Sequence, residues 1–171
     1  NGVWQNSEII ATGLNPINSI DTSYVNNNSV IAYAAKTNSD NSSMDDVEVF
    51  YFDGSTTRLT NDITADYSVT FLNDELYWIH ENSIVSITGG DNESMSVAVD
   101  QIPDSLSTIN VSNNTNGQKT ITWCQNDGTD TKIYGTYYNE LTSKFGTAVP
   151  LSKGDGVIRG WDATMMPDGK I

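Results

Sequence analysis

Residues 120–152, TITWCQNDGTDTKIYGTYYNELTSKFGTAVPLS, restrict the fold of this chain more than any other stretch. Residues 120–125 alternate apolar side chains with polar or small ones, which is the two-residue period of a strand. A turn cluster at 126–130 follows, and residues 132–139 then resume with several aromatic and β-branched side chains. A third run covers 145–151. The stretch therefore predicts antiparallel strands joined by polar turns.

The same plan recurs along the chain. Four alternating segments carry small polar side chains on one face: 19–25, 67–72, 107–112 and 161–166. If Asp21, Ser68, Thr108 and Asp162 are equivalent, the successive intervals between them are 47, 40 and 54 residues. Blades of four antiparallel strands repeat at about 40 to 50 residues in β-propellers. The period therefore favours such blades.

Further strands are expected to complete each blade. In the second strand of each repeat, an aliphatic residue lies two positions before an aromatic one, at 31 and 33, 76 and 78, and 121 and 123. The expected third strands are 47–52, 83–88 and 132–138, and the expected fourth strands are 57–60, 94–99 and 147–151.

These patterns predict an all-β fold, specifically a partial β-propeller of four-stranded antiparallel blades. The expected divisions are the outer strand of a preceding blade at 1–17, three blades at 18–65, 66–105 and 106–156, and the start of a further blade at 157–171. A β-sandwich is the alternative, because it also needs many short strands separated by turns. Helical periodicity is scarce throughout the sequence.

TITWCQNDGTDTKIYGTYYN, residues 120–139, resembles a divergent repeat of bacterial extracellular β-propellers, of the WD40-like or TolB-like kind found in surface proteins of Gram-positive bacteria. The resemblance covers most of the chain. The Gly-His and Trp-Asp dipeptides of WD40 repeats are absent from the expected places, and Trp161-Asp162 falls on a predicted inner strand. The resemblance implies a fragment of a larger protein with an extracellular or cell-surface location.

Charge and apolar content limit the partners. Eight Lys and Arg against 22 Asp and Glu give a formal net charge of −14, which repels phosphate backbones and anionic lipid. We therefore expect no nucleic-acid partner. No apolar run approaches the length of about 18 residues that spans a membrane, so no membrane insertion is expected. Cys124 is the one cysteine, and we expect it to be a small buried side chain.

No motif in the chain names a reaction, and we expect a protein that is not an enzyme. The alternative interpretation assigns Asp21 and Asp162 as catalytic residues of a propeller glycoside hydrolase, because they occupy the same phase of two predicted inner strands. Two carboxylates with different pKa values can supply the acid and the base for glycoside hydrolysis. The simpler interpretation is that small polar residues line a wet channel, as at the equivalent positions Ser68 and Thr108.

No metal site or other cofactor is predicted. His80 is the only histidine, and it follows Trp78 on a strand whose two faces are both apolar, which favours a structural role. Together with Cys124 it gives two ligands, whereas a zinc site of His and Cys needs three or four. The acidic loops 40–46 and 126–130 lack the ligand spacing of a calcium-binding EF-hand.

The functional expectation is a non-catalytic binding or spacer module whose ligand is a polysaccharide or a protein. The chain has four tryptophans and eight tyrosines, which would stack on sugar rings if they were exposed together on one rim. Most aromatic residues at strand positions instead pack in the core. Exposed blade edges are expected to promote self-association.

Overall fold

A computed structural model describes residues 17–36, 47–62, 64–88, 95–100, 102, 106–126, 130–154, 156–158 and 160–171. For residues 47, 48, 106 and 107 it describes the backbone alone. The outer strand expected before residue 17, the acidic loop at 40–46 and positions 127–129 of the turn at 126–130 lie outside the described residues.

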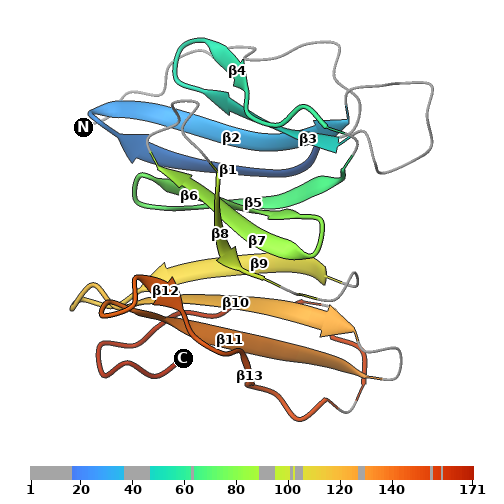
Figure 1. Ribbon diagram of the computed structural model, residues 1–171, viewed down its shortest axis with the longest axis vertical. Helices are drawn as coiled ribbons and strands as arrows, with labels where there is room; N and C mark the ends of the chain where they lie inside the picture. The colour runs from blue at the N-terminus through green and yellow to red at the C-terminus, as the bar shows by residue number, and fades with distance from the viewer. Residues whose placement is uncertain are drawn as a thin grey trace.

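The described residues contain no helix and form three antiparallel sheets, so the all-β prediction is confirmed (Figure 1). The first sheet has the order β1 (Ile17–Val25), β2 (Asn28–Lys36), β3 (Val47–Phe52) and β4 (Thr56–Arg58). The second has the order β5 (Asp66–Leu72), β6 (Glu75–His80), β7 (Ser83–Thr88) and β8 (Ser96–Val99). The third contains β9 (Leu106–Asn113), β10 (Lys119–Asn126), β11 (Thr131–Asn139) and β12 (Lys144–Phe145), and β13 (Val149–Pro150) also pairs with β11. No helix of the length and apolar character needed to cross a membrane occurs in the part of the chain that the structure describes.

Tight turns set the register of the hairpins. Asn26 and Asn27 have φ values of 48° and 65°, and they connect Val25 directly to its register partner Asn28. Two consecutive residues with positive φ are typical of the type I′ turn, whose twist matches that of the flanking strands. Asparagine tolerates this conformation better than most residues, which explains the local sequence.

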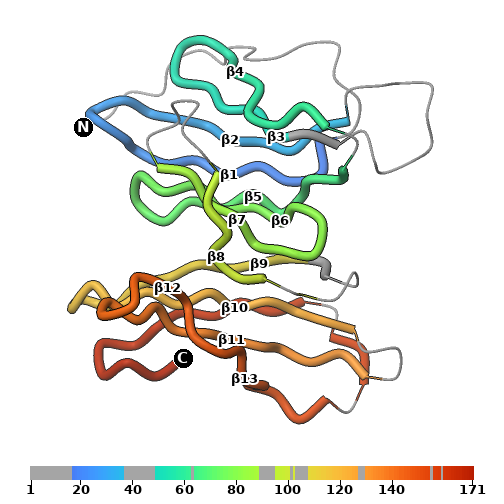
Figure 2. Tube along the Cα trace, viewed as in Figure 1, coloured from blue at the N-terminus to red at the C-terminus, as the bar shows by residue number. Residues whose placement is uncertain are grey.

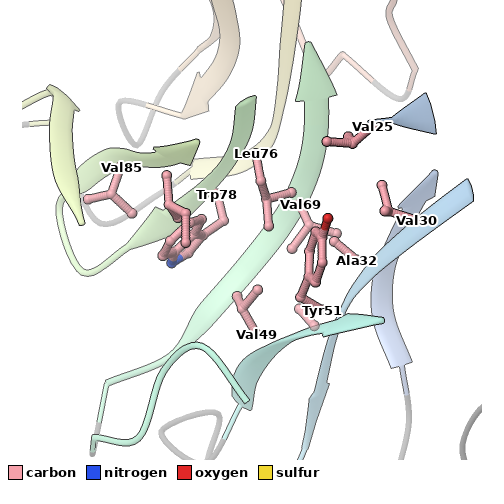
Figure 3. Close-up of a cluster of buried hydrophobic side chains, with 11 residues drawn as sticks. Val25, Val30, Ala32, Val49, Tyr51, Val69, Leu76, Trp78 and Val85 are labelled. Atoms are coloured by element: carbon pink, nitrogen blue, oxygen red, sulfur yellow. The ribbon is translucent and has the colours of Figure 1, made fainter. Parts of the chain in front are cut away.

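The three sheets are stacked face to face in chain order (Figure 2). One hydrophobic core lies between the first and second sheets, where Val30 and Val49 face Leu76 and Trp78 (Figure 3). A second core lies between the second and third sheets and contains Tyr77 and Ile121, among others. The middle sheet is therefore covered on both faces.

Strand β6 shows how the sequence encodes this arrangement. Leu76 and Trp78 point into the first core, whereas Tyr77 and Ile79 point into the second. All four side chains are at most 2% exposed. Because neighbouring residues of a strand face opposite sides, a continuous apolar run is what a sheet buried on both faces requires.

Two strand predictions were wrong in detail. The predicted fourth strand 147–151 is only the two-residue β13, and β12 forms a separate short strand before it. Between them, the Gly146 amide donates to the Tyr137 carbonyl of β11 at 2.9 Å, whereas the Gly146 carbonyl accepts from the Thr136 hydroxyl at 2.7 Å. Residues 161–166 form no strand. Among the described residues, Met166 donates to the Lys170 carbonyl at 2.7 Å and accepts from the Gly169 amide at 2.9 Å, which are turn contacts and not a strand ladder.

Candidate functional site

The first strands of consecutive sheets are held together by side-chain hydrogen bonds. Between β1 and β5, Ser19 Oγ accepts from the Val69 amide at 3.0 Å, Asp21 Oδ2 accepts from the Phe71 amide at 2.7 Å, and Ser23 Oγ donates to the Asn73 carbonyl at 2.6 Å. The residue numbers of the partners rise together. Strands β1 and β5 therefore run in the same direction, although every pair within a sheet is antiparallel.

Strands β5 and β9 are joined by a side-chain hydrogen bond of the same kind. Ser68 lies at an irregularity of β5 with φ at 58°, and its Oγ accepts from the Ile109 amide of β9 at 2.8 Å. A residue other than glycine with positive φ is strained, and here the unusual backbone accompanies a contact between two sheets.

Residues 160–166 continue the series beyond β9. Ser112 Oγ accepts from the Met165 amide at 3.1 Å, and Thr108 Oγ1 accepts from Trp161 Nε1 at 3.1 Å. The partner numbers again rise together, so this segment runs in the direction of β9. It lies next to β9 as β9 lies next to β5, although it has no strand ladder of its own.

The two carboxylates considered as catalytic residues lie at opposite ends of this series. Asp21 is on β1 and Asp162 is on the segment beyond β9, with β5 and β9 between them. Asp21 Oδ1 accepts from the Thr22 amide at 2.8 Å, in addition to the contact of its other oxygen with Phe71. Asp162 Oδ1 accepts from Asn110 Nδ2 and from the Ala163 amide, both at 2.8 Å. Asp21 thus joins β1 to β5, and Asp162 joins the segment 160–166 to β9.

A groove of about 620 Å³ lies between β8 of the second sheet and strands β10, β11 and β12 of the third sheet. Its lining combines apolar, aromatic and polar side chains: Val97, Val99, Asp100, Trp123, Gln125, Tyr134, Lys144, Phe145 and Thr147. Trp123 and Tyr134 are stacked at the base, with ring centroids 6.1 Å apart and planes inclined by 15°. Trp123 is only 2% exposed, whereas Tyr134 and Phe145 are half-buried. The groove therefore offers two aromatic rings to a ligand.

A second hollow of about 260 Å³ adjoins the groove and shares Lys144 and Phe145 with it. Glu75 lies in its wall and accepts a hydrogen bond from Lys119 Nζ at 2.6 Å. Tyr77 meets the ring of Phe145, which lines this hollow, edge to face with centroids 6.4 Å apart. Burial, assisted by the negative charge of Glu75, raises the pKa of the Tyr77 phenol, so Tyr77 stays neutral.

A buried polar network lies at the other end of β6. Asp66, at the start of β5, is 0% exposed. Its Oδ1 accepts from Trp78 Nε1 at 3.1 Å and lies 2.9 Å from His80 Nδ1. Burial raises the pKa of the Asp66 carboxyl, and the nearby Thr60 hydroxyl and His80 oppose that shift.

The structure brings together residues that the sequence left separate. His80 has a polar partner, as its structural interpretation expects, but nothing singled out Asp66 as that partner. The sequence signal that could have indicated this network was a carboxylate at the start of one strand, with Trp78-Ile79-His80 at the end of the next strand. Cys124 is buried, as predicted.

No protein-family model matches the chain, and neither a curated protein nor a solved structure matches it.

Proposed function

We propose that this chain is part of a β-propeller and serves as a non-catalytic binding module of a secreted or cell-surface bacterial protein. Its ligand in this proposal is a polysaccharide, held in the groove between β8 and the outer part of the third sheet. The observation that carries the proposal is the composition of that groove, where half-buried aromatic rings lie beside polar side chains.

The stacking of the sheets supports the propeller assignment over a β-sandwich. A sandwich encloses one core between two sheets. Here the middle sheet is covered on both faces by sheets built from consecutive strands, and the first strands β1, β5 and β9 lie side by side. The segment 160–166 extends the series by one more step. A repeated step of this kind is what a radial assembly of blades needs.

The groove has the size and chemistry of a saccharide site. Its volume falls within the range of about 300 to 1,000 Å³ that is usual for small-ligand sites. Sugar rings have apolar C–H faces, which suit the rings of Tyr134 and Phe145, and hydroxyl groups, which suit Gln125, Asp100 and Lys144. The net charge of −14 disfavours polyanionic glycans, so the expected ligand is a neutral polysaccharide.

The test is a titration of the chain with neutral oligosaccharides of glucose, mannose and N-acetylglucosamine, followed by calorimetry and by tryptophan fluorescence. We expect saturable binding of one of these, weakened about tenfold or more by Gln125→Ala or Lys144→Ala. Lys153→Ala is the matched control, since Lys153 is also exposed but does not line the groove. Absence of binding across the panel, or equal effects of Lys144→Ala and Lys153→Ala, would overturn the proposal.

The same panel distinguishes the enzyme interpretation. If an oligosaccharide is cleaved and Asp21→Asn abolishes the cleavage, the chain belongs to a glycoside hydrolase and the non-catalytic assignment is wrong.

A further inference from the structure

Three side chains of metal-ligating type meet where the first sheet connects to the second. Asp62 lies on the connection from β4 to β5, Asp66 is the first residue of β5, and His80 is the last residue of β6. Asp66 and His80 are register partners in the β5–β6 ladder. One ligand atom from each of the three residues lies within 4.8 Å of the other two.

Asp66 supplies an independent sign that a ligand belongs there. The residue is 0% exposed, and although the Thr60 hydroxyl lies near the carboxyl, Oδ2 is buried without a hydrogen bond of good geometry among the described residues. An unsatisfied buried polar atom costs about 1–3 kcal/mol, and more if it is charged. The Asp62 carboxylate brings a second negative charge to within 4.8 Å of the Asp66 carboxyl. A bound cation would satisfy the free oxygen and offset the repulsion between the two carboxylates.

The cluster is open to solvent on the side of Asp62. This residue is exposed, and with Thr60 and Trp78 it lines a hollow of about 290 Å³. An ion can therefore approach from the side of Asp62 and of His80, whose side chain is 16% exposed, although Asp66 itself is fully buried. Three protein ligands also leave a coordination position for water.

The donor set indicates which ion fits. One imidazole with two carboxylates suits zinc and related divalent transition metals. Calcium instead takes six to eight oxygen ligands, so the imidazole nitrogen of His80 does not suit it.

We propose that Asp62, Asp66 and His80 bind a divalent transition-metal ion, with Zn²⁺ as the best match. The ion fastens the connection between the first two sheets to the end of β6. The proposed site is separate from the groove, which lies between the second and third sheets.

The test uses the full chain, freed of metal with a chelator and then titrated with zinc chloride by calorimetry and by thermal unfolding. We expect one saturable site per chain and a rise in the unfolding temperature on binding. Asp62→Asn and His80→Gln should each weaken binding by about tenfold or more. Because Asp62 is exposed, its substitution leaves the core intact.

Glu81→Gln is the matched control. Glu81 is an exposed carboxylate directly after His80, so its substitution removes the same charge as Asp62→Asn but no member of the cluster. Unchanged zinc affinity in this variant supports the proposal. Equal loss in Asp62→Asn and Glu81→Gln would overturn it, because zinc would then be attracted only by the acidic surface. Lack of saturable binding, or calcium binding as tight as that of zinc and insensitive to His80→Gln, would also overturn it.

Discussion

The amide of Phe71 in β5 donates a hydrogen bond of 2.7 Å to the carboxylate of Asp21 in β1. A side chain of one sheet thus serves as the hydrogen-bond acceptor for the backbone of the next. Ser19 with Val69 and Ser68 with Ile109 repeat this relationship. The sheets are therefore joined at their first strands by polar contacts and elsewhere by apolar packing.

Asp21→Ala is expected to destabilise the fold by about 1–3 kcal/mol, because it leaves the Phe71 amide without its charged acceptor. The free energy of unfolding in urea measures the effect. Glu140→Ala is the control, since Glu140 is exposed in the turn after β11 and its loss changes the net charge equally. An effect of Asp21→Ala no larger than that of the control would show that the contact contributes nothing.

Two substitutions at Ser68 separate its hydrogen bond from its backbone strain. Both Ser68→Ala and Ser68→Gly remove the acceptor of the Ile109 amide. Glycine adopts the φ of 58° freely, whereas alanine does not, so Ser68→Ala should be less stable than Ser68→Gly by about 1 kcal/mol. Urea unfolding of the two variants gives the difference directly. Equal free energies of unfolding for the two variants would contradict a positive φ at residue 68.

The Asp66 carboxyl should give stability a characteristic pH dependence. Burial raises its pKa in the folded chain above the ordinary value of 3.8. The stability that it contributes is therefore fully present below that value and is lost as pH rises through the raised pKa. The free energy of unfolding of the wild type minus that of Asp66→Asn should fall with rising pH in metal-free buffer. A difference that grows with pH would mean that the fold favours the ionised form.

Part of this architecture was readable from the sequence. The apolar run of β6 predicted a strand with two buried faces, and the regular alternation predicted most other strands. Trp78 and Trp123 pack in the core, as aromatic residues on strands usually do. These features follow from hydrophobic periodicity, which is a local property and can be read without knowing the tertiary contacts.

The remaining features depend on contacts between distant residues. Where the last strand splits, the Gly146 carbonyl accepts from the Thr136 hydroxyl, a contact that exists only once β11 has its neighbour. The network of Asp66, Trp78 and His80 forms only when β5 pairs with β6. The saccharide groove likewise depends on how the second and third sheets meet. The hydrophobic periodicity of the sequence does not predict these long-range contacts.

The outer face of β1 is expected to promote self-association. Ile20 and Tyr24 are 56% and 66% exposed on this strand. Sedimentation velocity over a range of concentrations should show association, reduced in the double variant Ile20→Ser, Tyr24→Ser. Leu141→Ser removes an apolar side chain that is 96% exposed in a turn and should have little effect. A monomer at every concentration would contradict the expectation.

Amide hydrogen exchange tests the stacking of the sheets most directly. The amides of Val69, Phe71, Ile109 and Met165 donate to side-chain oxygens of β1, β5 or β9, the first strand of the preceding sheet, so protection at these positions reports contact between consecutive units of the stack. We predict slow exchange at all four in the intact chain, and faster exchange at Phe71 in Asp21→Ala. Fast exchange at all four, with β2, β6 and β10 still protected, would show that the sheets form without stacking and would contradict the account.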